Sequence, residues 1–252
     1  MRTRFAAILA ILLSIGAEGS APPLTVAAAA DLQAILPELV RTFEAESSID
    51  VRLTFGSSGT FFAQIQNGAP FDVYLSADAE YPRTLVKLGK GDADSLYTYA
   101  IGQLVIWSRT GSGVALGRGL SALTDSAVTR VAIANPAHAP YGRAAIAALE
   151  AAGIADRVRP KLVLGENAAQ AAQFVQSGNA QAGLLPLSLA VAPALAAAGE
   201  HVAVPTHLYP PILQAAVIVS ASARKAAADR FLAFLRRPST MDRLAQAGFL
   251  RP

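Results

Sequence analysis

The chain has 252 residues, of which 53% are hydrophobic and 15% are charged, and it contains no cysteine. This composition excludes an intrinsically disordered chain, and the lack of cysteine excludes disulfide scaffolds, thiolate metal sites and cysteine nucleophiles. The formal net charge is only +3, and no basic stripe with interleaved aromatic residues is present, so we expect no nucleic-acid partner.

The N-terminal segment is typical of a cleaved secretory signal peptide. Arg2 and Arg4 form a positively charged start, an apolar run covers residues 5–15, and small residues up to Ala21 offer cleavage positions. The apolar run, about 11 residues, is shorter than the roughly 20 that a membrane-spanning helix needs. We therefore expect export, removal of residues 1–21, and a mature protein in the periplasm.

After this segment, short apolar runs alternate with amphipathic stretches, many of which end at a glycine. The apolar runs predict strands at 24–28, 51–55, 72–77, 97–107, 128–134, 161–164, 182–185 and 212–219. The amphipathic stretches predict helices at 31–47, 60–67, 81–88, 141–152, 167–176, 187–198, 223–235 and 240–247. Asp31 is expected to cap the first helix and Pro37 to kink it. This alternation predicts an α/β protein with mixed, mainly parallel sheets.

The predicted strand–helix units, eight in the ranges above, are too many for one small sheet of typical size. We therefore expect two lobes. The long run Tyr97–Trp107 and the later run Ile212–Val219 are the natural places for the chain to cross between them.

Small residues separate a predicted strand from a predicted helix at four places, 28–31, 56–60, 138–142 and 165–168. Helix N-termini present unpaired N–H groups and about half a positive charge, so they suit anions. Small side chains allow an anion to approach the backbone. Every α/β sheet has such junctions, usually filled by caps and water, so only the convergence of several at one cleft would distinguish a binding site.

The glycine-rich loop Gly56–Thr60 matches neither of two catalytic motifs. No lysine follows Gly59, as a P-loop requires, and the residue order is not that of a nucleophile elbow. Of three histidines that could act as a general base, His138 alone lies in a candidate loop. We expect no catalytic residues and no enzyme; a secreted serine hydrolase using Ser57 or Ser58 is the alternative from another class.

Six segments together carry a family resemblance. They are LTVAAAADL at 24–32, FGSSGTFFAQI at 55–65, NGAPFDVYLSAD at 67–78, AIANPAHAPYG at 132–142, GENAAQAAQFVQSG at 165–178 and FLAFLRRPSTMDRLAQAGF at 231–249. In these segments the chain resembles the periplasmic molybdate-binding proteins of ABC importers. The resemblance implies a two-lobed periplasmic binding protein of type II, with the ligand in the cleft between lobes. Lobe 1 would comprise residues 22–101 and 207–252, and lobe 2 residues 102–206.

The resemblance also implies a function. The protein would be a monomer that captures molybdate or tungstate and delivers it to an ABC permease, with no free metal ion and no cofactor. The ligand positions of the family fall on Asp31, Ser58, Tyr141 and the backbone amide of Ala168. A tyrosine of the second lobe falls on Pro186, and the hydroxyl of Tyr141 could replace it from the opposite wall. Another small anion or a metal ion is the alternative ligand.

Asp31 stands where the family carries serine or asparagine. A carboxylate about 4 Å from a unit charge costs about 4 kcal/mol at an effective dielectric constant of 20, and a dianion costs about twice that. Three arrangements would remove this cost: the side chain turns away as a helix cap, the carboxyl is protonated, or the ligand is not molybdate. We expect the cap, because aspartate is among the most favourable N-cap residues.

Overall fold

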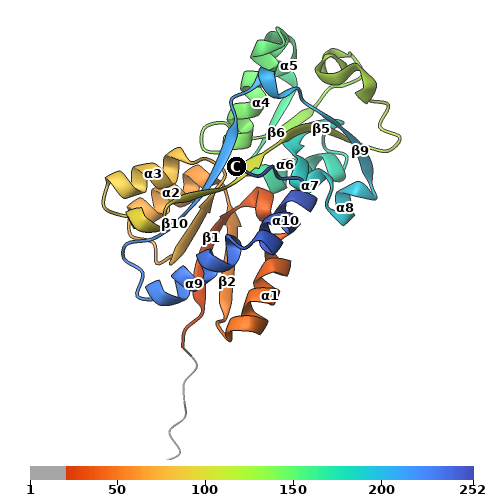
Figure 1. The fold of residues 1–252 in the computed structure, drawn as a ribbon. Coiled ribbons are helices and arrows are strands. Elements are labelled where there is room, and N and C mark those ends of the chain that lie inside the picture. The colour runs from red at the N-terminus through yellow and green to blue at the C-terminus, as the bar shows by residue number, and fades with distance from the viewer. Residues whose placement is uncertain (1–20) are drawn as a thin grey trace, which may run out of the picture.

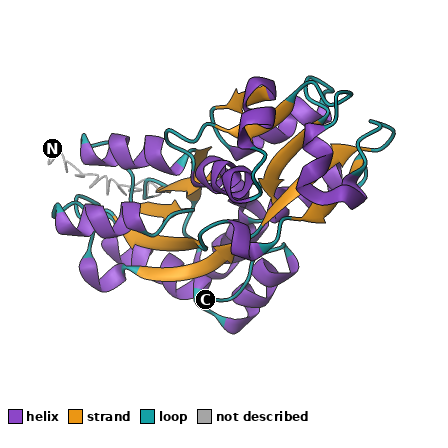
Figure 2. Cartoon of the chain, turned by 90° about the horizontal axis from the view of Figure 1, so that it is seen from above, coloured by secondary structure: helices purple, strands orange, loops and turns teal. Residues whose placement is uncertain are grey.

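The computed structural model describes residues 21–252, so nearly all of the predicted signal peptide lies outside the described residues. The described chain forms two α/β lobes, each built on a five-stranded mixed sheet with helices around it (Figure 1). The strand order is β2-β1-β3-β10-β4 in lobe 1 and β7-β6-β8-β5-β9 in lobe 2. Seen from above, the two sheets lie side by side (Figure 2). The predicted two-lobed α/β fold is confirmed.

Strands and helices alternate along most of the chain. The strands are β1 (Leu24–Ala29), β2 (Val51–Gly56), β3 (Val73–Ser76), β4 (Tyr97–Gly102), β5 (Leu104–Arg109), β6 (Val131–Ala134), β7 (Leu162–Gly165), β8 (Ala182–Pro186), β9 (Gly199–Ala203) and β10 (Ile212–Ile218). The helices are α1 (Leu36–Ser47), α2 (Ser58–Gln66), α3 (Glu80–Lys87), α4 (Pro140–Ala151), α5 (Ala155–Val158), α6 (Ala168–Gln176), α7 (Leu187–Ala190), α8 (Pro193–Ala196), α9 (Lys225–Leu235) and α10 (Pro238–Gln246). Among residues 21–252, no helix combines the length and the apolar character needed to cross a membrane.

The sheets are mixed, as predicted, but parallel pairing does not predominate in the described chain. Four strand pairs are parallel and four are antiparallel. The antiparallel pairs all involve β10 in lobe 1 or β5 in lobe 2. β5 and β10 are each the first strand that the chain forms after it crosses into the lobe. Each runs antiparallel to the two strands beside it.

The predicted long strand at 97–107 is two strands in different lobes. β4 ends at Gly102 in the first sheet and β5 begins at Leu104 in the second, so the chain crosses at Gln103. The prediction that the run 212–219 itself crosses is wrong, because β10 pairs only with β3 and β4 of lobe 1. The return crossing lies just before it, between β9 and β10. The predicted lobe boundaries, after residue 101 and before residue 207, stay a prediction, because the strand order assigns strands to lobes but does not define the exact residue at which a lobe ends.

The helix predicted from Asp31 to Ser47 begins later than expected. After β1 the chain makes a short 3₁₀ turn, Ala30–Leu32, and α1 starts at Leu36. Pro37 therefore occupies the first turn of α1, where its missing N–H is not needed, and the predicted kink is wrong. A proline at this position disfavours helical geometry in the residue before it and clashes with a carbonyl four residues earlier, which explains the late start.

A second predicted helix, Leu187–Ala198, is also interrupted. It is replaced by the short helices α7 and α8, and Pro193 stands at the first position of α8. The following strand β9 was not predicted from the sequence. It pairs with the buried strand β5 along the edge of the second sheet, and its side chains are half-buried or exposed.

The loops that follow the strands hold the two lobes against each other. The backbone N–H of Gly59 in lobe 1 donates to the carbonyl of His138 in lobe 2 at 2.8 Å, and the hydroxyl of Ser57 donates to the same carbonyl at 2.5 Å. Arg143 on α4 pairs with Asp78 after β3. The described structure is therefore a closed form of the two lobes.

Adding one methyl group at Gly59 should separate the two lobes where Gly59 contacts His138. A Cβ at Gly59 would lie 2.7 Å from the carbonyl oxygen of His138 and 2.7 Å from the hydroxyl of Tyr81. Alanine is itself a good helix former, so Gly59→Ala should leave α2 intact and push the lobes apart. Small-angle scattering of the ligand-free variant should give a larger radius of gyration than that of the parent protein.

Gly117→Ala is the matched control, because a Cβ at Gly117 meets nothing within 4 Å. Equal radii for the two variants would contradict the expected opening.

Candidate functional site

One cavity lies where the loops of the two lobes meet. All four predicted strand–helix junctions contribute to its wall, and Asp31, Ser58, Tyr141 and Ala168 all line it. Its volume is about 10 Å³, which is room for roughly one water molecule. The junctions that were predicted separately along the chain therefore converge on a single small space between the lobes.

Ser57 and Ser58 open helix α2 and have different roles. The Ser57 hydroxyl does not cap α2 but reaches across to His138, as described above. The Ser58 hydroxyl oxygen accepts the backbone N–H of Ala77 at 3.0 Å, and the Ser58 carbonyl accepts the hydroxyl of Tyr74 at 2.7 Å. These bonds hold Ser58 in place through its acceptors, and they leave its hydroxyl proton for another partner.

The second lobe contributes the start of helix α6. The Asn167 side chain caps this helix by accepting the N–H of Gln170 at 3.1 Å. Ala168 is the first residue of the helix, where a backbone N–H has no acceptor within the helix. Its small side chain is buried in the wall of the cavity. The Ala168 amide is thus a neutral donor at the cavity.

Asp31 faces the interior, so the expectation that it caps a helix and turns away is wrong. It lies within the 3₁₀ turn and makes no side-chain cap bond among the described residues. Its exposed fraction is 1%. Oδ2 accepts a hydrogen bond from Nε2 of Gln214 at 2.5 Å, while Oδ1 is buried without a partner in the described chain.

Gln214 on β10 joins Asp31 to two tyrosines. Tyr99 on β4 donates its hydroxyl to Oε1 of Gln214 at 2.8 Å, and this bond directs Nε2 toward Asp31. Nε2 also donates to the hydroxyl of Tyr141 at 3.1 Å. Gln214 has no exposed surface. Sequence reasoning missed it, although a lone glutamine inside an apolar strand is a signal that could have been followed.

Residues of lobe 2 also surround Asp31 and the cavity. The Ser188 hydroxyl donates to the backbone carbonyl of Asp31 at 2.8 Å, so lobe 2 also holds the 3₁₀ turn from outside. Pro186, where the resemblance places a tyrosine, is buried at the end of β8 and is not part of the cavity wall. Tyr141 stands instead on the α4 side, with its hydroxyl close against the backbone of Gly102.

Burial controls the protonation of this cluster. It raises the pKa of Asp31 from 3.8 to about 6, against the lowering effect of the hydrogen bond from Gln214 and of the nearby Tyr141 hydroxyl and backbone amides. Burial, followed by the charge of Asp31, raises the pKa of both Tyr99 and Tyr141 well above 10. No lysine, arginine or histidine lines the described cavity, so no cation opposes the cost of an ionised Asp31 there.

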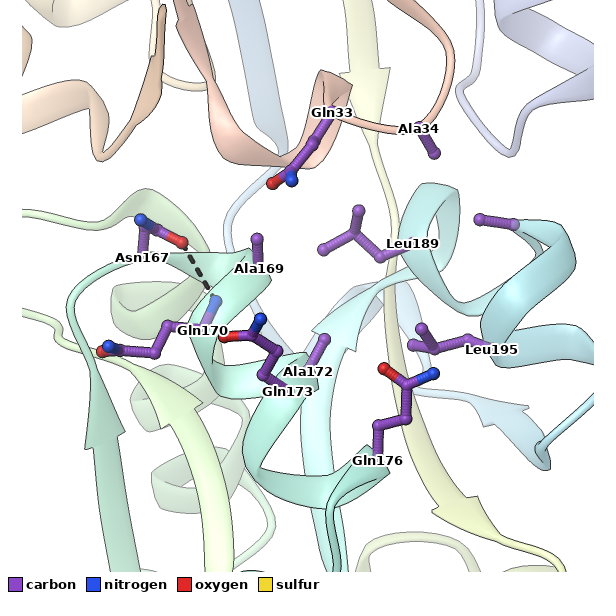
Figure 3. Close-up of a pocket in the computed structure, with 11 residues that line it drawn as sticks. Gln33, Ala34, Asn167, Ala169, Gln170, Ala172, Gln173, Gln176, Leu189 and Leu195 are labelled. Carbon is purple, nitrogen blue, oxygen red and sulfur yellow. Dashed lines mark hydrogen bonds between the residues drawn. The ribbon is translucent and has the colours of Figure 1, made fainter.

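A larger groove of about 520 Å³ adjoins the cavity and shares Asn167 with it. Figure 3 shows Gln33 of lobe 1 above helix α6, whose side chains Gln170, Gln173 and Gln176 belong to lobe 2. All side chains that line the groove are uncharged. The lining of this groove is therefore polar but neutral.

The arrangement of Ser57 and His138 does not form a nucleophile with its base. The single proton of the Ser57 hydroxyl goes to the His138 carbonyl, so Nδ1 of His138, 2.9 Å from the same oxygen, must be the donor in that pair. A histidine that donates to a serine cannot take its proton. Within residues 21–252, no group of three or more histidine, aspartate or glutamate side chains could hold a metal ion.

The chain is similar to known proteins over most of its length. A family model described as bacterial extracellular solute-binding protein matches residues 24–250. The molybdate-binding protein ModA of Rhodobacter capsulatus is 36% identical over 245 residues, which are 97% of this chain and 95% of that protein. ModA of Azotobacter vinelandii is 38% identical over 224 residues, or 89% of this chain and 88% of that protein. The solved structure of the Azotobacter vinelandii periplasmic molybdate-binding protein superposes with a TM-score of 0.85 at 33% identity, covering 91% of this chain and 99% of that one.

The raised pKa of Asp31 should make the ligand-free protein less stable as the pH rises. An acid whose pKa is higher in the folded than in the unfolded state stabilises the fold while protonated, and this contribution is lost as the pH passes through its folded value. A rise from 3.8 to about 6 corresponds to about 3 kcal/mol. Asp31→Asn, which stays neutral and keeps an acceptor for Gln214, should therefore unfold at higher urea concentration than the parent protein at pH 8.

The difference between the two unfolding free energies should shrink between pH 6 and pH 4 and disappear below pH 4. Taking this difference removes the pH dependence that both proteins share. A difference of the same size at pH 4 and pH 8 would mean that the charge of Asp31 is not its cause.

Proposed function

The chain belongs to the family of bacterial extracellular solute-binding proteins that includes the molybdate-binding protein ModA, and we propose that it captures molybdate and delivers it to an ABC permease. The main support for this proposal is the composition of the cavity wall. Neutral donors from both lobes converge on one small cavity, which no cationic side chain lines among the described residues. Such a site suits a compact anion held by hydrogen bonds. Tungstate, which has the same shape and charge, is the second ligand that we propose.

In this proposal the four predicted residues surround the anion from both sides. Ser58 donates its hydroxyl proton from lobe 1, and Ala168 donates its backbone N–H from lobe 2. Tyr141 contributes from the start of α4, and Asp31 from the 3₁₀ turn after β1. The support for this assignment is that all four line the cavity, and that the other bonds of Ser58 use only its acceptors.

Capture requires the lobes to separate and close again. A cavity of about 10 Å³ is smaller than a five-atom oxyanion, so the anion enters an opened cleft and the lobes then close on it. The closed contacts are already built from the same loops, since Ser57 and Gly59 bond to His138 directly beside the donors. We propose that the closed, loaded form is the one that docks on the permease.

We also propose where and in what state the protein acts. The family is extracellular, and the N-terminal 21 residues have the pattern of a cleaved signal peptide, so the mature protein would work as a periplasmic monomer. The uncharged glutamine groove beside the cavity gives an anion an approach without a competing ion pair.

Isothermal titration calorimetry of the mature protein tests the ligand. Molybdate and tungstate should each bind with one site per chain, and sulfate and phosphate should bind more weakly. In parallel, ligand at about 100 times its dissociation constant should add roughly 2.7 kcal/mol to the unfolding free energy. No heat and no thermal shift with millimolar molybdate or tungstate would contradict the proposed function.

Ser58→Ala tests the proposed donor. Removing a hydrogen bond to a charged acceptor should weaken molybdate binding by roughly 0.5–3 kcal/mol. Ser121→Ala is the matched control, because Ser121 is exposed in lobe 2 and its hydroxyl bonds locally to the carbonyl of Arg118. Equal dissociation constants for the two variants would remove Ser58 from the site.

A further inference from the structure

We propose that Asp31 binds the oxyanion as a neutral carboxylic acid, with Oδ1 donating a proton to a ligand oxygen, so that each captured anion brings one proton into the cleft. This inference rests on the proposed function, because it concerns how the same site holds its ligand. It adds a linkage between anion capture and pH that the donor set alone does not require.

The two oxygens of Asp31 are in different environments. Oδ2 is occupied, since it accepts from Nε2 of Gln214 at 2.5 Å. Oδ1 is buried and has no partner among the described residues, while Asp31 as a whole lines the cavity. A buried oxygen without a partner is costly, so the cavity side must supply one when the cleft is occupied. The ligand oxygen is the group available to do so.

Gln214 fixes which oxygen carries the proton. Its Oε1 accepts from Tyr99, so its amide nitrogen must face Asp31, and an N–H donor requires Oδ2 to be an acceptor. A protonated Asp31 therefore carries its hydrogen on Oδ1. Gln214 is in this sense a positioning residue, which directs the acid proton toward the cavity without touching the ligand.

The alternative, an ionised Asp31 beside a dianion, conflicts with the surroundings. Burial already raises the pKa of Asp31 to about 6 in the closed cleft, and a dianion at Oδ1 would raise it further. The side chains that face Asp31 from its packed neighbours offer no positive charge. They are Tyr99 and Tyr141, both held neutral, and Gln214, while α6 and α7 carry no titratable residue and Arg52 of β2 is exposed.

Binding of one anion in this way takes up one proton. Above pH 7 the ligand-free protein carries an ionised Asp31 and molybdate is a dianion, so one proton must come from the solvent when the complex forms. The apparent affinity should fall about tenfold for each pH unit above the pKa of ligand-free Asp31. With a pKa of about 6, the dissociation constant should rise roughly 80-fold from pH 6.5 to pH 8.5, a range in which molybdate stays a monomeric dianion.

Calorimetry of the mature protein tests this linkage. Molybdate is titrated at pH 6.5, 7.5 and 8.5, and at pH 8 in both Tris and HEPES, whose different ionisation enthalpies report the protons taken up. The parent protein should lose affinity along this series and take up about one proton per anion at pH 8. Asp31→Asn should bind with nearly constant affinity, take up no proton, and exceed the parent protein by up to about 100-fold at pH 8.

His138→Gln is the control for the other titratable group at the cleft. His138 contacts Ser57, and its Nε2 lies 3.7 Å from Glu166, so it is an ionisable side chain at the contact between the lobes. The His138→Gln variant should keep the pH slope of the parent protein whatever its absolute affinity. A slope that disappears in this variant and persists in Asp31→Asn would overturn the assignment to Asp31.

Other outcomes separate the inference from the proposed function. If the parent protein binds molybdate equally at all three pH values, the inference fails and the proposed function stands. If Asp31→Asn abolishes binding while it folds normally by circular dichroism, Asp31 is needed as an ionised acceptor and the inference is overturned. If neither protein binds any oxyanion, the proposed function itself fails.

Discussion

The hydrogen bond from Gln214 to Asp31 joins the parts of the molecule on which the site depends. It connects the turn after β1 with β10, the strand on which the chain returns to lobe 1. Through the same amide nitrogen, Gln214 also reaches Tyr141 of lobe 2. A polar side chain without exposed surface is tolerated only when its groups are bonded, so these contacts constrain one another. The position of Asp31 in the cavity is therefore set by the sheet beneath it, and not by the loop in which it lies.

This constraint gives the cavity an unusual electrostatic character. Its wall consists of backbone amides, small side chains and hydroxyl groups, and Asp31 is its one carboxyl group among the described residues. Neutral donors attract a compact anion without the desolvation cost of buried lysine or arginine. In such surroundings a single proton on Asp31 changes the net charge of the site more than any other feature of the wall. If Asp31 binds the anion as proposed, the selectivity of the site would depend on proton number as well as on size.

Much of the fold follows from local patterns in the sequence, and the rest depends on distant contacts. Apolar runs predict most strands within a few residues, and the four small-residue junctions converge as their pattern suggested. The start of α1 was misjudged because Pro37 was read as a kink inside a helix capped by Asp31. The role of Gln214 could not be derived, because its partner Asp31 lies 183 residues away along the chain. Propensity places an aspartate at a cap, but the tertiary structure decides where its side chain points.

Closure of the cleft on an anion and protonation of Asp31 would be coupled in this arrangement. Asp31 is buried because lobe 2 covers it, with Ser188 bonded to its carbonyl and Tyr141 beside its side chain. Its raised pKa is caused mainly by that burial, so separating the lobes would return the carboxyl to water and toward its ordinary pKa. With the proposed protonated Asp31 in the loaded form, opening at neutral pH would release that proton and restore a negative charge in the cleft. That charge would repel a bound dianion at the moment when the lobes separate, so the residue that accepts the anion in the closed form would favour its release from the open one.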